Sequence, residues 1–192
     1  MPLTKTIFRT NCIKKLKEAS THNKFYNDYH LNKRLQKELN RLKYKSILFY
    51  YPLPFEADIT KTIKKIRRKC DIFVPFMQGA SFKMVPFRLP LKRSKFGIYE
   101  AGNSLRNIKK IDIAIVPTVG IDGNLQRIGF GKGMYDRFFA KLNKKPYTIF
   151  IQEKICKTNK FICDDYDISC DVLITPQLEV RHKRIISPKA KL

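Results

Sequence analysis

The sequence predicts a three-layer α/β domain with a largely parallel central sheet. Short apolar runs alternate along the chain with longer segments whose apolar residues recur every three to four positions, the pattern of strands alternating with helices. The run IDIAIVP at 111–117 is the clearest buried strand. The 192 residues are the length of one ordinary domain. Sheets of this kind bind ligands outside the carboxyl ends of their strands.

The first half of the chain is expected to hold three helices and three strands. Apolar residues form one stripe in each expected helix, as Leu31, Leu35 and Leu39 do in the second. Pro86 favours an edge position for the third strand, because proline cannot donate a hydrogen bond to a sheet ladder. The expected helices cover 4–19, 21–43 and 59–69, and the expected strands cover 46–51, 71–76 and 81–89.

The second half is expected to begin with the buried strand 111–117 and to continue with a helix over about 133–143. Two further strands, at 146–152 and 171–175, complete the series. The chain is therefore expected to form a single domain over residues 1–178, followed by a basic C-terminal tail over 179–192.

The charge of the chain favours partners that are polyanions. The formal net charge is +24, which predicts a strongly positive field. Lysines outnumber arginines and are spread along the whole chain, and no RNA-binding signature is present, so nucleic acid is not the expected partner. The stretch 147–179 is instead rich in acids, which fits either retention of a cation or a solvated loop.

The cysteines and the apolar runs indicate a cytoplasmic protein. The five cysteines are odd in number and form no CxxC pair, and a domain of this length needs no disulfide for stability. Reduced cysteines and a cytoplasmic setting are therefore expected. No apolar run approaches the roughly 20 residues of a membrane-spanning helix.

The stretch RIGFGKGMYDRFF, 127–139, places three of only eight glycines at alternate positions, Gly129, Gly131 and Gly133. Glycines leave backbone N–H groups open to a ligand, and the helix expected after them would add its positive end, so the loop is expected to bind phosphate. Lys132 would add charge, and Asp136 could hold a magnesium ion that bridges phosphates. A tight strand-to-helix turn with no ligand is the alternative.

The familiar phosphate-binding patterns do not fit this loop. Gln126 stands where the first glycine of a P-loop would be, and Gly133 stands where that pattern needs Ser or Thr. Met134 occupies the last glycine position of the dinucleotide-binding pattern. Another phosphate-binding family is therefore indicated.

The longer run IDIAIVPTVGIDGNLQRIGFGKGMYDRFFAKL resembles the C-terminal hallmark of the 5-formyltetrahydrofolate cyclo-ligase (methenyltetrahydrofolate synthetase) family. In that family a strand ending in proline is followed by N-x-R-L-G-x-G-x-G-Y-Y-D. Three weaker blocks agree and occur in the expected order: Lys5 and Arg9 four residues apart, Glu56 before a helix, and Asp171 at the start of a strand. The resemblance therefore extends over residues 5–175.

The resemblance implies a Rossmann-like domain with a mixed central sheet and an ATP-dependent reaction. Such enzymes use MgATP to convert 5-formyltetrahydrofolate into 5,10-methenyltetrahydrofolate, with release of ADP and phosphate. The γ-phosphoryl group is transferred to the formyl oxygen, N10 attacks the activated carbon, and phosphate departs. Phosphoryl transfer depends mainly on positioning and charge neutralisation, which suits a loop of glycines and cations.

The resemblance also implies the roles of individual residues. Catalysis is expected of Lys132 and Arg127, and magnesium binding of Asp136 and Asp171. Glu56, an acceptor-only carboxylate, would bind the pterin N–H groups, with Tyr51, Phe130 and Met134 lining the folate site. The ATP-binding set would be Lys5, Arg9, Arg127, Ile128, Gly129, Phe130, Gly131, Lys132, Gly133, Met134 and Tyr135.

Two departures from the family pattern and several alternatives remain. Met134 replaces the first of two tyrosines, and Ala101 stands where a proline often follows Glu100. Two alternatives to the cyclo-ligase interpretation remain open. In another ATP-dependent ligase or kinase on the same fold, the phosphate-binding assignments would hold and the folate-binding ones would not. In a basic RNA-associated protein, neither set of assignments would hold. We expect a monomer or small homo-oligomer whose substrate carries an anionic polyglutamate tail, which the positive field would attract.

Overall fold

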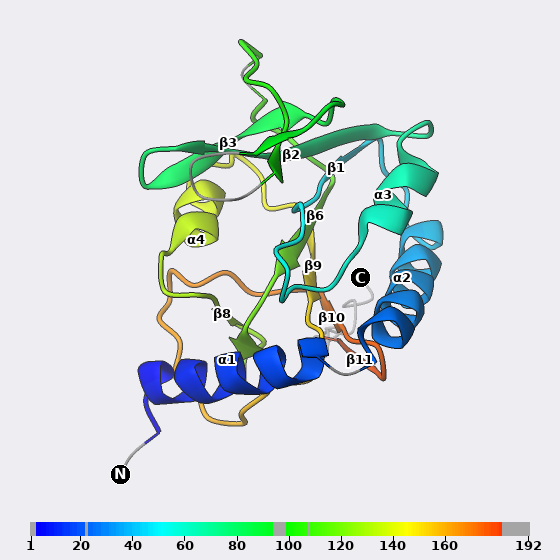
Figure 1. The fold of residues 1–192 in the computed structure, drawn as a ribbon. Helices are drawn as coiled ribbons and strands as arrows, with labels where there is room; N and C mark the ends of the chain where they lie inside the picture. The colour runs from blue at the N-terminus through cyan, green and yellow to red at the C-terminus, as the bar shows by residue number, and fades with distance from the viewer. Residues whose placement is uncertain (1–2, 22, 94–98, 107, 182–192) are drawn as a thin grey trace, which may run out of the picture.

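The computed structural model describes residues 3–21, 23–93, 99–106 and 108–181 (Figure 1). Its centre is a seven-stranded sheet in the order β11-β10-β9-β6-β1-β2-β3. The inner pairs are parallel, whereas β11 and β3 at the two edges run antiparallel to their neighbours. The strands of this sheet are β1 Ser46–Leu48, β2 Asp71–Gln78, β3 Ser81–Pro86, β6 Ile113–Pro117, β9 Tyr147–Ile151, β10 Val172–Ile174 and β11 Glu179–Arg181.

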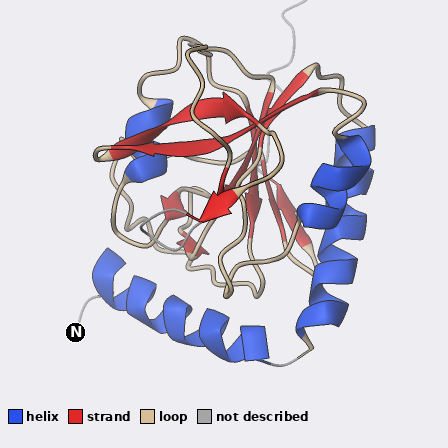
Figure 2. Ribbon diagram, turned by 45° about the horizontal axis from the view of Figure 1, so that its top comes forward, coloured by secondary structure: helices blue, strands red, loops and turns tan. Residues whose placement is uncertain are grey.

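The mixed, largely parallel sheet and the edge position of β3 confirm the expected fold class. Helices lie on both faces of the sheet (Figures 1 and 2), and two small hairpins lie outside it. The helices are α1 Lys5–Thr21, α2 Lys24–Asn40, α3 Thr60–Ile66 and α4 Met134–Phe139, and the hairpin strands are β4 Lys92–Arg93, β5 Tyr99–Glu100, β7 Gly120–Ile121 and β8 Arg127–Ile128. None of the helices in the described ranges is long and apolar enough to cross a membrane.

The buried core is divided between the two faces of the sheet because successive residues of a strand point to opposite sides. On β6, Ile113 and Ile115 belong to the cluster that contains the leucines of α2 and the isoleucines of α3. Ala114 and Val116 belong instead to the cluster of α4, where Phe138 stacks on Phe82 of β3 at 4.4 Å between ring centroids. Strand β6 is buried at all of its positions, as its continuous apolar run predicts.

Several elements are shorter than their sequence patterns suggest. Helix α4 ends at Phe139, four residues before the expected end, because the N–H groups of Lys141 and Leu142 bond three residues back and turn the chain toward β9. Strand β1 ends at Leu48 although Phe49 and Tyr50 are also buried.

The C-terminal boundary also differs from the expected one. Glu179–Arg181, expected to begin the basic tail, form β11 instead. The guanidinium of Arg181 bonds both carboxylate oxygens of Glu38 on α2, which anchors this edge strand. The remaining part of the expected tail, 182–192, lies outside the described residues.

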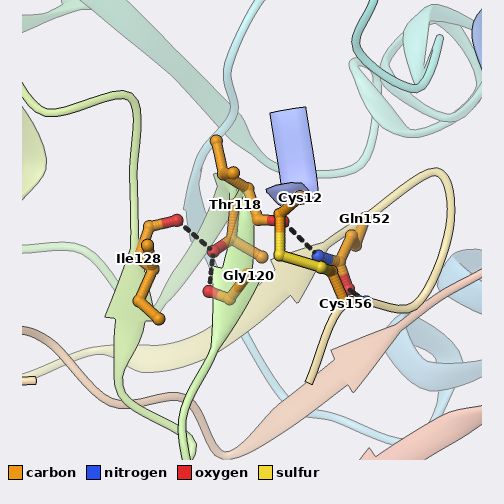
Figure 3. Close-up of a disulfide and its surroundings, with 7 residues drawn as sticks. Cys12, Thr118, Gly120, Ile128, Gln152 and Cys156 are labelled. Atoms are coloured by element: carbon orange, nitrogen blue, oxygen red, sulfur yellow. Dashed lines mark hydrogen bonds between the residues drawn. A yellow bond between two sulfur atoms is a disulfide. The ribbon is translucent and has the colours of Figure 1, made fainter. Parts of the chain in front are cut away.

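The expectation that all cysteines are reduced was wrong. Cys12 of α1 and Cys156, which follows β9, form a disulfide across 144 residues of sequence (Figure 3). Gly120 of β7 leaves the space: a Cβ there would lie 3.2 Å from Cys12 Sγ and 2.8 Å from a ring carbon of Phe8. Sequence spacing could not reveal the pair, because the fold alone brings α1 to the end of β9. Cys70, Cys163 and Cys170 are free.

Candidate functional site

A cavity of about 660 Å³ lies beyond the carboxyl ends of the central strands, at the edge of the sheet where the fold class predicts a ligand. Three segments of the chain form its walls. The segment after β1 contributes Tyr51, Phe55 and Glu56; the β2–β3 hairpin contributes Met77, Gly79, Ala80 and Phe82; and the glycine loop contributes Phe130, Lys132, Gly133 and Met134.

Arg127 of β8 is a buried cation in the wall of this cavity. Its side chain is only 6% exposed, and its Nε donates to the carbonyl of Pro117 at 3.0 Å. The guanidinium lies 4.9 Å from the ring centroid of Tyr135, and no carboxylate of the described residues is within ion-pair distance. Burial lowers the pKa of Arg127, while Asp136 opposes that shift. A buried cation without an ion pair is costly, so an anionic ligand is favoured here.

The backbone donors of the glycine loop have no partner in the described part of the chain. Several carbonyls at the loop do have one: Ile128 accepts from the Val119 N–H at 3.0 Å, Gly129 from Arg9 Nε at 2.9 Å, and Lys132 from Arg137. The N–H groups of residues 129–133, in contrast, donate to no group in the described part of the chain. A row of free N–H groups is the arrangement that binds phosphate oxygens.

Each of the alternate glycines lies beside an arginine. A Cβ on Gly129 would collide with the guanidinium of Arg127, and one on Gly133 would lie 2.9 Å from that of Arg137. Gly131 faces Arg9 at a longer distance. The spacing of the glycines therefore does more than free the backbone: it makes room for arginines from β8, α4 and α1 around one loop.

Lys132 extends from this loop with an unengaged ammonium. The side chain is exposed and lines the cavity, and its ammonium makes no hydrogen bond or ion pair with any described residue. Phe130, next to it, is 38% exposed and meets the ring of Phe55 edge to face at 5.3 Å. A free cation thus stands beside an aromatic surface at the mouth of the cavity.

Glu56 is a carboxylate that lines the same cavity. Its Oε2 accepts the N–H of Leu53 at 2.9 Å, which holds the side chain in place. Burial raises the pKa of Glu56 to about 7, while that N–H and the charges of Arg127 and Lys24 act in the opposite direction. The carboxyl group can therefore change its protonation state near neutral pH.

The two cations expected on α1 reach the site in different ways. Arg9 contacts the loop directly through Gly129. Lys5 is instead held by two acids of the loop before β10, Asp164 at 3.1 Å and Asp167 at closer range. Burial lowers the pKa of Lys5, but the hydrogen bonds that Lys5 donates to these carboxylates outweigh it and the net shift is upward. Two acids of the acidic stretch seen in the sequence are thus paired with Lys5.

The two expected magnesium ligands have different partners. Asp136 accepts the N–H of Ile168 at 3.3 Å through Oδ1, whereas Asp171 accepts the N–H of Thr148 at 2.8 Å, at the start of β9. Across the described residues, no three His, Cys, Asp or Glu side chains are grouped to hold a metal ion. Magnesium in nucleotide sites is commonly bound by one or two carboxylates plus phosphate oxygens, so the assignment of Asp136 and Asp171 to magnesium stays a prediction.

The remaining expected residues line the cavity or support the loop. The ring of Tyr51 meets that of Tyr99 at 5.9 Å, and Met134 is among the lining side chains. Ile128 is buried and supports the loop through its carbonyl. Burial raises the pKa of Tyr135 well above its usual value, so its hydroxyl stays protonated.

The fold and the site together define an α/β protein with a candidate anion-binding site at the carboxyl edge of a mixed, largely parallel sheet. The sequence comparison identifies which kind. The model of the 5-formyltetrahydrofolate cyclo-ligase family matches residues 3–176, and the chain belongs to that family.

Named relatives agree with this assignment. A 5-formyltetrahydrofolate cyclo-ligase of Mycoplasma pneumoniae is 25% identical over 176 residues, which cover 91% of this chain and 100% of the relative. A probable 5-formyltetrahydrofolate cyclo-ligase of Schizosaccharomyces pombe is 28% identical over 148 residues, 62% of this chain and 72% of the relative.

Solved structures share the fold. A 5,10-methenyltetrahydrofolate synthetase of Aquifex aeolicus superposes with a TM-score of 0.76 at 21% identity, over 96% of this chain and 100% of the other. The corresponding enzyme of M. pneumoniae gives a TM-score of 0.71 at 22% identity, over 91% and 99%. At these identities the likeness supports the α/β fold.

Proposed function

We propose that the protein catalyses the ATP-dependent cyclisation of 5-formyltetrahydrofolate to 5,10-methenyltetrahydrofolate, with release of ADP and phosphate. One observation carries the proposal beyond family membership. The buried Arg127, without an ion pair in the described residues, adjoins the free N–H groups of the glycine loop and the cavity that Glu56 lines. A site for a polyphosphate and a site for a fused ring with N–H donors thus share one wall.

The reaction proceeds through two substitutions. The formyl oxygen attacks the γ-phosphorus of ATP, the bond from that phosphorus to the β,γ-bridging oxygen breaks, and ADP leaves. N10 of the folate then donates its lone pair to the formyl carbon, N10 loses its proton, and the carbon–oxygen bond breaks to release phosphate. The first step places negative charge on the transferred group, so fixed cations and N–H groups are the main source of acceleration.

The side chains divide this work according to their positions. Lys132, whose ammonium is free, and Arg127 would stabilise charge on the transferred phosphoryl group. The N–H groups of 129–133, with Arg9 and Lys5, would hold the rest of the triphosphate. Asp136, and by family resemblance Asp171, would hold magnesium, which neutralises phosphate charge when bound.

The folate would lie in the apolar part of the cavity. Glu56 would accept hydrogen bonds from the pterin N–H groups, and Tyr51, Phe130 and Met134 would contact its faces. A cytoplasmic monomer or small homo-oligomer is part of the proposal. So is a preference for polyglutamylated folate, supported by the net charge of +24; equal affinities for mono- and polyglutamate forms at low salt would contradict that preference.

The experiment follows the absorbance of the methenyl product after mixing the protein with MgATP and 5-formyltetrahydrofolate. Lys132→Ala should lower the rate by at least about 100-fold, as removal of one charge-stabilising donor does in other enzymes. Lys144→Ala is the matched control, since Lys144 is exposed and outside the cavity. If the unaltered protein binds ATP but forms no product, the phosphate site stands and the folate reaction is overturned.

A further inference from the structure

Arg137 of α4 joins two walls of the candidate site, and the roles described so far do not use it. Its guanidinium donates to the carbonyl of Ala80, from Nε at 2.9 Å and also from Nη2. The same Nη2 donates to the carbonyl of Lys132. Arg137 has no carboxylate partner among the described residues, and its Nε and Nη2 donate to two backbone carbonyls instead.

The two carbonyls belong to different walls of the cavity. Ala80 lies in the turn between β2 and β3, and Lys132 lies in the glycine loop. Three other contacts connect the same segments: Ser81 Oγ donates to the Met134 carbonyl at 3.1 Å, and the ring of Phe82 stacks on Phe138 and meets Tyr135 edge to face. Those contacts fix the start and body of α4. Only the Arg137 contact, among these, also holds the backbone of Lys132, which precedes α4.

The geometry around Lys132 depends on this contact. Gly133 has φ +57, a conformation that L side chains rarely adopt, and Arg137 occupies the space where a Cβ on Gly133 would be. The Lys132 carbonyl therefore faces Arg137, whereas the ammonium of the Lys132 side chain has no partner among the described residues. A backbone held in this way limits the directions in which the lysine side chain can extend.

We propose that Arg137 is a positioning residue that fixes the Lys132 backbone against the β2–β3 turn, so that the lysine ammonium meets the transferred phosphoryl group. The inference rests on the proposed function for its catalytic consequence. It predicts a loss in kcat with a smaller change in substrate binding, because Nε and Nη2 of Arg137 donate to backbone carbonyls and thereby orient a group, although the side chain also lines the cavity.

The kinetic test compares Arg137→Met, Arg137→Lys and Lys141→Met. Methionine keeps the length of the stem and removes both donors, so kcat should fall at least about tenfold while the KM for folate changes by less than about threefold. Lysine can donate to one carbonyl and should recover part of the loss. Lys141, just beyond α4 and exposed, is the matched control and should keep full activity. Full kcat in Arg137→Met would overturn the inference.

A second measurement does not depend on the reaction. Trypsin cleaves after lysine, and the Lys132–Gly133 bond should be cut several times faster in Arg137→Met than in the unaltered protein, as followed by mass spectrometry under native conditions. Lys141→Met should leave that rate unchanged. If the unaltered protein lacks cyclo-ligase activity, faster cleavage of Arg137→Met still supports the inference that Arg137 fixes the backbone of the glycine loop. An equal cleavage rate, or a lower melting temperature with unchanged kcat, would reduce Arg137 to an ordinary structural contact.

Discussion

Glu56 gives the candidate site its pH dependence at the scale of single residues. Its pKa is raised to about 7 by burial, so the carboxylate fraction rises about tenfold between pH 6 and pH 8. If the carboxylate binds the pterin N–H groups, the KM for 5-formyltetrahydrofolate should fall by a similar factor over that range. Steady-state kinetics at saturating ATP measure this, and Glu56→Gln should flatten the profile. A KM independent of pH in the unaltered protein would refute the role.

The same raised pKa has the opposite effect on stability. The native state keeps the proton of Glu56 to a higher pH than the unfolded chain, whose pKa stays near the ordinary value of about 4.5. The unfolded state therefore loses its proton first, and the contribution of Glu56 to stability falls as pH rises from about 4.5 through about 7. Urea titrations at pH 5 and pH 8 should show this loss in the unaltered protein and a smaller one in Glu56→Gln.

The substitution Gly129→Ala tests whether the loop needs a glycine here to leave space for the Arg127 side chain. A Cβ there would collide with the Arg127 guanidinium, which is buried and bonded to Pro117 and therefore has little freedom to move. Gly129→Ala should destabilise the protein by about 1–3 kcal/mol, the usual cost of overpacking, and should weaken ATP binding. Gly102→Ala is the control, because nothing lies within 4 Å of its added Cβ. Thermal melts and ATP titrations that do not separate the two variants would contradict this explanation of the spacing.

Helix α1 is the element whose attachment matters most to the site. It carries Arg9, which bonds the glycine loop, and the Cys12–Cys156 disulfide ties it to the segment after β9. A disulfide that closes a loop of this length stabilises a fold by roughly 5 kcal/mol in the chain-entropy description. Reduction, or Cys12→Ser, should therefore lower the melting temperature by roughly 10–20 °C.

The control for this prediction is Cys70→Ser, which removes a free thiol. It should melt at the temperature of the unaltered protein, and reductant should lower that temperature as much as before. ATP affinity should weaken together with stability in Cys12→Ser, because Arg9 lies on the same helix. A melting temperature insensitive to reductant would show that α1 is held by its packing alone.

Elements with a clear periodicity could be predicted, and those set by tertiary contacts could not. The leucines of α2 and the continuous apolar run of β6 sufficed to locate both, since each pattern reflects burial directly. The early end of α4 depends on a turn toward β9. The pairing of Glu179–Arg181 with β10 depends on Glu38 of a distant helix, which no local pattern encodes.

The candidate site shows the same division. Family resemblance located Arg127, Lys132 and Glu56, and the structure places them around one cavity. Arg137 was missed although it follows Asp136 directly, because the two carbonyls that it binds, those of Ala80 and Lys132, are far apart in the sequence and only the fold brings them together. The sequence showed that the stretch holding Asp164 and Asp167 is acidic, but not that these two residues pair with Lys5.

At the scale of the whole molecule, charge should control encounter with both substrates. The formal net charge of +24 produces a field that attracts ATP and folate, and salt screens it over about 10 Å at 0.1 M. Between about 50 and 500 mM salt, the KM for ATP should rise several-fold while kcat changes little. Ammonium acetate in place of sodium chloride controls for specific ions. An unchanged KM would mean that local contacts, and not the overall field, govern binding.

The contact of Arg9 with Gly129 joins residues 120 positions apart, and that of Lys5 with Asp167 joins residues 162 apart. During synthesis the first helix leaves the ribosome long before its partners exist. No incomplete chain can assemble these contacts until the segment before β10 has emerged. Nucleotide can therefore help the chain to fold only after the segment that holds Asp167 has been made, and fragments that end before that segment should gain no protection from ATP.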